Sequence, residues 1–153
     1  MFLERTAEKN GEPMITNFTM DKIDAKIEEI GLLPNQRYPK LNISIDDVET
    51  KNEKVVISYT FQAEYKDGEG DKSKDIGHIK LNGIVELAED KSKQAKIVEQ
   101  WKEKGNLPLE IAEEVINGLN FRCSATGTLV AYSLGLIPPL VIGQTKISEP
   151  SKK

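Results

Sequence analysis

The sequence holds very few of the side chains on which most catalytic and metal-binding sites depend. It contains one cysteine, Cys123, and one histidine, His78. A single cysteine excludes an internal disulfide, which is typical of a protein from a reducing compartment. One cysteine and one histidine cannot form a zinc site unless several carboxylates complete it. A phosphate-binding loop of the GxxxxGK type and the EF-hand spacing are also absent from the sequence, so we expect no metal and no other cofactor.

Both of these side chains have a simple structural interpretation. His78 falls at an outward position of a predicted strand, beside a charged loop, where a histidine needs no catalytic role. Cys123 lies on the apolar face of a predicted helix, where cysteine packs as a small hydrophobic residue. The sequence places no histidine near Cys123 that could activate it as a nucleophile. We therefore predict that the protein is not an enzyme.

Long apolar runs and an excess of basic residues are also absent. The longest apolar run, Leu129 to Ile142, is interrupted by Ser133, Gly135 and two prolines, and it is too short to span a membrane. The N-terminus lacks the apolar segment of a signal peptide. The formal net charge is -4, which argues against nucleic-acid binding. We expect a soluble, cytoplasmic protein with no membrane insertion and no nucleic-acid partner.

Hydrophobic residues at every second position predict strands over the first half of the chain. Lys54 to Tyr65 is the clearest example, because its odd-numbered residues form one continuous apolar face. Leu41 to Val48 and Ile76 to Ala88 alternate in the same way, and Gly83 marks a bulge or a close backbone approach.

The stretch from Phe18 to Ile27 also alternates, but its two halves differ in parity. A strand with one buried face then requires a bulge, which we place near residues 21–22. A short helix over residues 21–30 is the alternative, because the isoleucines there also have helical spacing. The strands that follow favour the strand.

The second half of the chain predicts two helices. Residues 89–104 carry an apolar set and end at Gly105. Apolar residues at i+4 spacing from Ile111 to Cys123 predict a long helix that ends near Leu134, with Gly135 as its C-cap. Strands followed by helices are typical of the α+β class. We therefore predict a four-stranded antiparallel sheet, with helices packed on one face and a long C-terminal helix.

The second half of the long helix is unusual because Cys123 to Thr145 contains no charged residue. A helix without charge on any face must be covered on several sides. A chain of 153 residues can hardly cover it alone, so we predict a homo-oligomer, either a dimer or a tetramer. The predicted interface residues are two apolar residues on the outward sheet face and two small residues of the helix: Val56, Ile84, Gly127 and Ala131.

Apolar side chains also occur in two segments marked by prolines. One is the loop from Gly31 to Lys40, and the other follows the long helix. Such residues pack against the core in many proteins, and for Leu136 this alternative is equally favoured. Together they suit a groove that accepts extended apolar segments. The predicted groove residues are Leu32, Leu33, Tyr38, Leu136, Ile137, Leu140 and Val141.

The order of these elements resembles the SecB export chaperone family. The strand meander LNISIDDVETKNEKVVISYTFQAEY and GHIKLNGIVEL, with the helix and tail EIAEEVINGLNFRCSATGTLVAYSLGLIPPLVI, carries the resemblance over residues 18–142. It implies a nucleotide-free holdase that binds unfolded polypeptides in apolar grooves of a homotetramer, a dimer of dimers. The family serves protein transport, and SecB-like toxin-antitoxin chaperones serve other partners.

We expect three parts in the chain. Residues 1–16 are predicted to be a flexible arm, residues 17–143 a SecB-like α+β domain, and residues 144–153 a flexible tail. The alternative to a holdase is a small oligomeric binding module of the same fold, with one dedicated protein partner or a small apolar ligand.

Overall fold

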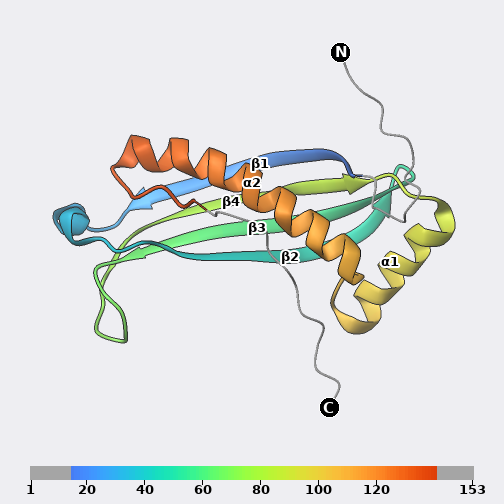
Figure 1. Ribbon diagram of the computed structural model, residues 1–153, viewed down its shortest axis with the longest axis horizontal. Helices are drawn as coiled ribbons and strands as arrows, with labels where there is room; N and C mark the ends of the chain where they lie inside the picture. The colour runs from blue at the N-terminus through green and yellow to red at the C-terminus, as the bar shows by residue number, and fades with distance from the viewer. Residues whose placement is uncertain (1–14, 141–153) are drawn as a thin grey trace.

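The computed structural model describes residues 15–140, which form one sheet and two α-helices (Figure 1). Most of the predicted arm, the predicted tail and Val141 lie outside the described residues. The strands are β1 (Ile15–Ile27), β2 (Lys40–Lys51), β3 (Lys54–Lys66) and β4 (Asp75–Leu87). They are antiparallel neighbours in the order β1-β4-β3-β2, so β1 and β2 are the two edges.

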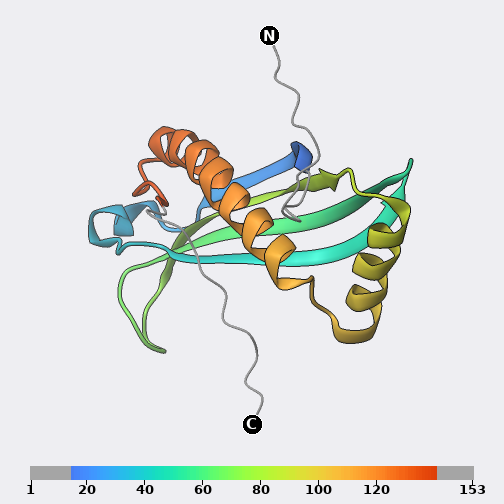
Figure 2. The ribbon, with the colours of Figure 1, turned by 45° about the vertical axis from the view of Figure 1, so that its right-hand side comes forward.

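The helices follow the sheet in sequence and cover one side of it. Helix α1 (Lys91–Lys104) packs at the end of the sheet where β2 turns into β3, and helix α2 (Leu109–Leu134) crosses one face (Figure 2). A 3-10 helix, η1 (Ile30–Asn35), opens the crossover from β1 to β2, where the sequence predicts only a loop. This arrangement confirms the predicted α+β class, the four-stranded sheet and the long C-terminal helix.

The core lies between the sheet and α2. The odd-numbered face of β3, from Val55 to Tyr65, is buried as predicted, because period-2 alternation puts all these side chains on the helix-covered face. From α2, the residues at i+4 spacing from Ile111 to Cys123 complete this core. Strand β1 also confirms the strand over the helical alternative, and its register shifts between Met20 and Lys22 as predicted.

Gly83 lies in β4, one of the two central strands, opposite Met20 of β1. A Cβ atom at this position would stand 2.0 Å from the carbonyl oxygen of Thr19. Only glycine leaves room for that oxygen, so the predicted close backbone approach is confirmed.

The helix ends follow the capping signals of the sequence. Asp90 caps α1 by accepting a hydrogen bond from the Lys93 N–H at 2.8 Å, so this helix begins at Lys91 and not at residue 89. Gly105 and Gly135 end the two helices in the left-handed conformation, at φ 73° and 79°.

Helix α1 is fastened to the sheet by one buried polar side chain. Gln94 donates from Nε2 to the carbonyl of Glu53 at 2.8 Å and to that of Glu89 at 2.7 Å. Glu53 and Asn52 form the tight β2–β3 turn with φ of 64° and 52°, as the primed hairpin turns require.

Candidate functional site

The structure brings the two proline-marked segments together at one end of the sheet. The side chain of Gln36, in the crossover, donates to the carbonyl of Gly135 at 2.9 Å. It accepts from the N–H of Ile137 at 2.8 Å. Gln36 and Gly135 are 99 residues apart in the sequence. One amide side chain therefore joins the crossover to the segment that follows α2.

Two tyrosines hold the same segment. Tyr65, at the end of β3, donates from its hydroxyl to the carbonyl of Ile137 at 2.6 Å. Tyr38 donates to the carbonyl of Leu140. Burial raises the pKa of Tyr65 well above its usual range, so its hydroxyl stays a hydrogen-bond donor across the physiological range. Side chains therefore hold the backbone after α2, although this segment is not a strand of the sheet.

The predicted groove residues divide into core and surface. Leu136 is only 4% exposed and belongs to the core, which was the alternative interpretation of this residue. Leu32, Leu33 and Ile137 are partly buried and pack against that core. Tyr38 and Leu140 are 54% and 50% exposed, so they carry most of the apolar surface at this site.

A hollow of about 430 Å³ opens next to Tyr38. It lies between the crossover, the paired ends of β2 and β3, and the β3–β4 loop. Its lining is polar and charged apart from Tyr38 and two glycines: Arg37, Tyr38, Lys40, Glu64, Lys66, Gly68, Glu69, Gly70 and Ser73. This hollow could not be predicted from the sequence, because its walls come from two stretches of chain, residues 37–40 and 64–73, that meet only in the fold.

The outer face of α2 carries a second apolar surface. Phe121, Leu129 and Tyr132 are 76%, 71% and 84% exposed. Spacings of eight and three residues put them on one side of the helix. These three residues were not predicted from the sequence, although their helical spacing can be seen there.

The predicted interface residues of α2 face the sheet instead. Ala131 is fully buried, and Gly127 is buried against Pro139, whose Cγ would lie 2.7 Å from a Cβ at this position. The missing side chain at Gly127 makes room for Pro139 of the segment after α2. Both residues are buried within the single chain, so we correct their assignment to an outward interface. On the outer sheet face, Ile84 is partly buried and Val56 is 8% exposed in the single chain.

Cys123 and His78, the single cysteine and the single histidine, lie where the sequence predicts them. Cys123 is buried, and this burial raises the pKa of its thiol to about 12, so it is not a thiolate near neutral pH. His78 lies on the outer sheet face, 3.6 Å from Asp24 of β1 and 3.9 Å from Glu28, which directly follows β1. Within residues 15–140, no group of histidine, cysteine and acidic side chains is placed to hold a metal ion. None of the helices described there combines the length and apolar character of a membrane span.

Comparison with known proteins decides which fold this is. No protein-family model and no curated protein matches the sequence. The structure matches the Mycobacterium tuberculosis SecB-like chaperone Rv1957, solved in complex with a ChAD peptide from the Rv1956 HigA1 antitoxin. The match has a TM-score of 0.58 and covers 93% of this chain and 95% of that chain. The fold is SecB-like.

This result confirms the resemblance to SecB at the level of the fold. The two SecB-like chains share 8% sequence identity, so the similarity lies in the arrangement of strands and helices. Function belongs to a site and not to a fold, and it has to be argued from the residues of this chain.

Proposed function

We propose that the protein is a cytoplasmic, nucleotide-free holdase of SecB-like fold that binds extended apolar segments of unfolded polypeptides. The observation that carries this proposal is the junction of the crossover with the segment after α2. Gln36, Tyr38 and Tyr65 hold the backbone of that segment, and Tyr38 and Leu140 present their apolar side chains to solvent beside it.

The energetics of such a groove suit reversible holding. Segments that contain Pro34, Pro39, Pro138 and Pro139 are already stiff, so presenting apolar side chains from them costs little further entropy. Apolar burial stabilises a complex by roughly 25 cal/mol per Å² before ordering costs are subtracted. Contacts between apolar side chains require no particular sequence in the client, so many clients can bind. A protein of the same fold has been solved with a bound antitoxin peptide, which supports a peptide-binding role for this protein.

The test is aggregation suppression without nucleotide. We expect the wild-type protein to suppress the light scattering of several unrelated denatured proteins at about one oligomer per client. The double substitution Leu33→Ser with Tyr38→Ser should weaken suppression severalfold, with little change in the thermal midpoint.

A matched control is Val98→Ser with Trp101→Ser on α1, which removes two partly buried apolar side chains far from the groove. If the control loses as much suppression as the groove variant, the groove is misplaced. If the wild type suppresses no aggregation at all, the holdase proposal is wrong. Binding of one client alone would favour the dedicated binding module.

We further propose that the protein acts as a homo-oligomer, a dimer or a tetramer. Phe121, Leu129 and Tyr132 form an exposed apolar stripe on α2, and Leu129 and Tyr132 lie in the half of the helix without charged residues. Such a stripe is suited to a second copy of the same face.

A further inference from the structure

Three cationic side chains surround the hollow beside Tyr38. Arg37 comes from the crossover, Lys40 begins β2 and Lys66 ends β3. The backbone N–H of Arg37 donates to the carbonyl of Lys66 at 3.0 Å, which fixes the crossover to the end of β3. These cations therefore converge because two strand ends and the crossover meet, in a protein whose overall charge is negative.

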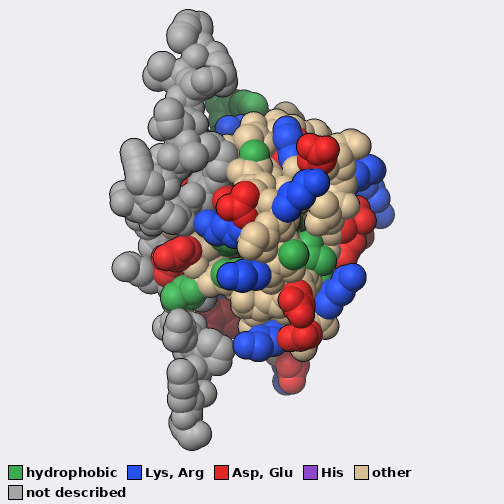
Figure 3. Space-filling view, turned by 90° about the vertical axis from the view of Figure 1, so that its right-hand side faces the viewer, with side chains coloured by type: hydrophobic (Ala, Val, Ile, Leu, Met, Phe, Trp, Pro, Cys, Tyr) green, Lys and Arg blue, Asp and Glu red, His purple; other side chains and the backbone are tan. Residues whose placement is uncertain are grey.

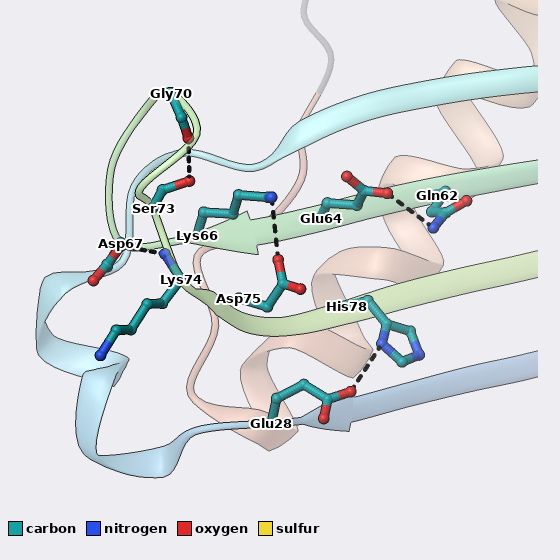
Figure 4. A network of polar contacts seen from close by, with 10 residues as sticks. All are labelled: Glu28, Gln62, Glu64, Lys66, Asp67, Gly70, Ser73, Lys74, Asp75 and His78. Carbon is teal, nitrogen blue, oxygen red and sulfur yellow. Dashed lines mark hydrogen bonds and ion pairs between the residues drawn. The ribbon is translucent and has the colours of Figure 1, made fainter.

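The far wall of the hollow is a loop with its own hydrogen bonds. Ser73 donates from Oγ to the carbonyl of Gly70 at 2.8 Å, and the N–H of Lys74 donates to Oδ1 of Asp67 at 2.8 Å (Figure 4). A loop closed in this way by local bonds presents a defined wall.

One of the three cations is already paired. Lys66 points towards Asp75 from the end of β3, and its Nζ lies 3.2 Å from Oδ1 of that residue (Figure 4). Arg37 and Lys40 form no salt bridge within residues 15–140. Two cations with exposed side chains are therefore available to an anion that enters the hollow.

Two carboxylates also line the hollow and limit its positive charge. Glu64 lies opposite Lys40 in the β2–β3 register, and its Oε2 accepts from Gln62 at 3.2 Å. Glu69 is an exposed residue of the β3–β4 loop. Arg37 stands beside Tyr38 on the crossover, outside the strands, so no acidic residue is paired opposite it as Glu64 is opposite Lys40. The side of the hollow next to the groove is therefore its positive side.

Tyr38 belongs to both the groove and the hollow. Tyr38 lines the hollow, and its hydroxyl donates to the carbonyl of Leu140, which is the other exposed apolar residue among the described groove residues. An extended peptide rises about 3.3 Å per residue. A client residue anchored on Tyr38 and Leu140 therefore has neighbours within reach of Arg37 and Lys40.

We propose that this hollow binds an acidic side chain of the client, so that the groove prefers apolar segments with a neighbouring aspartate or glutamate. The inference rests on the proposed function and names the class of peptide that the groove takes. Carboxylates pair well with the planar guanidinium of arginine. Lys40, three residues further along the same stretch at the start of β2, adds a second charge.

Three labelled peptides that share one apolar core and differ in a flanking Glu, Gln or Lys residue test the proposal. At low salt we expect the Glu peptide to bind about fivefold more tightly than the Gln peptide, and the Lys peptide more weakly than both, since exposed ion pairs are individually weak. The difference should shrink in about 1 M salt, where the Debye length falls to about 3 Å. Arg37→Gln with Lys40→Gln should bring the affinity for the Glu peptide down to that for the Gln peptide.

Charge reversal separates recognition from misfolding. Arg37→Glu should make the Lys peptide the tightest of the three, which is a gain that a damaged fold cannot produce. The matched control is Lys91→Gln with Lys96→Gln, which removes two exposed lysines from α1 at the other end of the sheet, where charges of both signs are interspersed (Figure 3). The control should keep the preference for the Glu peptide.

Each remaining outcome has a distinct meaning. If the three peptides bind equally well, the acidic preference is wrong and the holdase proposal stands. If the α1 control abolishes the preference as fully as the Arg37 and Lys40 variant does, net charge explains it and the site is wrong. If no peptide binds, the proposed function itself fails.

Discussion

At the scale of single residues, polar side chains far apart in the sequence hold the groove together. Gln36 uses both ends of its amide, since it donates to Leu33 and Gly135 and accepts from Ile137. A partly buried N–H or carbonyl that loses its partner costs more than the bond itself contributes, because it gives up water without replacement. This single side chain is therefore expected to control the order of the segment after α2.

Replacing Gln36 with alanine tests this role. We expect Gln36→Ala to lower the free energy of unfolding by about 1–3 kcal/mol. Amide hydrogen exchange should become faster at Ile137, whose N–H loses its acceptor. The measurement is urea unfolding combined with exchange followed by mass spectrometry or NMR.

The control for Gln36 is Gln100→Ala, because Gln100 makes an exposed bond to Asn106 at 2.7 Å within its own helix–helix connection. It should cost well under 1 kcal/mol, as surface substitutions usually do. Unchanged exchange at Ile137 in the Gln36 variant would show that Tyr38 and Tyr65 hold the segment without Gln36.

At the scale of elements, strand β3 shows how one register decides the whole sheet. It lies between β2 and β4, and Ile57 pairs with Val48 on one side and Val85 on the other, with all three buried. Because side chains alternate between the faces, a shift of one residue would move this entire set to the outer face.

Two neighbouring substitutions in β3 check this register. We expect Ile57→Ala to destabilise the protein by about 2–5 kcal/mol, because it leaves a cavity between the sheet and α2. Val56→Thr, on the outer face, should cost less than half as much. Chemical unfolding of both variants gives the comparison, and a larger loss from Val56→Thr would reverse every facing assignment in the sheet.

At the scale of the whole molecule, one face of α2 is left uncovered in the single chain. The stripe of Phe121, Leu129 and Tyr132 is exposed, while the opposite side of the same helix is buried on the sheet. A second copy of the same face would remove this apolar area from water, and a two-fold axis makes such a contact self-complementary.

Light scattering measures the resulting mass. The chain has a mass of 17.1 kDa, and we expect the native particle to have a mass of two or four chains at micromolar concentration. Leu129→Glu with Tyr132→Glu should shift the particle towards the monomer, since it introduces repelling charges into an apolar contact.

The control for this variant is Ser92→Glu with Lys96→Glu, at exposed positions of α1, and it should keep the native mass. A wild-type protein that is monodisperse at the mass of one chain would end the oligomer proposal.

The sequence by itself determined the elements and their facing. The signals are local: period-2 alternation in β3 and β4, i+4 spacing from Ile111 to Cys123, and the glycines that end both helices. Each follows from the geometry of a single strand, helix or helix end, so it can be recognised without knowledge of the fold. The presence of η1 and the first residue of α1 were harder to predict from the sequence, because each depends on a turn or a cap of only a few residues.

Only the tertiary structure decided which apolar residues are surface. Leu136, Gly127 and Ala131 lie in segments that looked available for binding, yet they face the sheet, while Phe121 and Tyr132 of the same helix face outwards. The physical reason is that the second half of α2, from Cys123 onward, has no charged residue to mark the side that turns towards water. The groove, with Gln36 at its junction, and the hollow required residues from distant stretches to meet, and such pairings have no periodicity for a sequence to display.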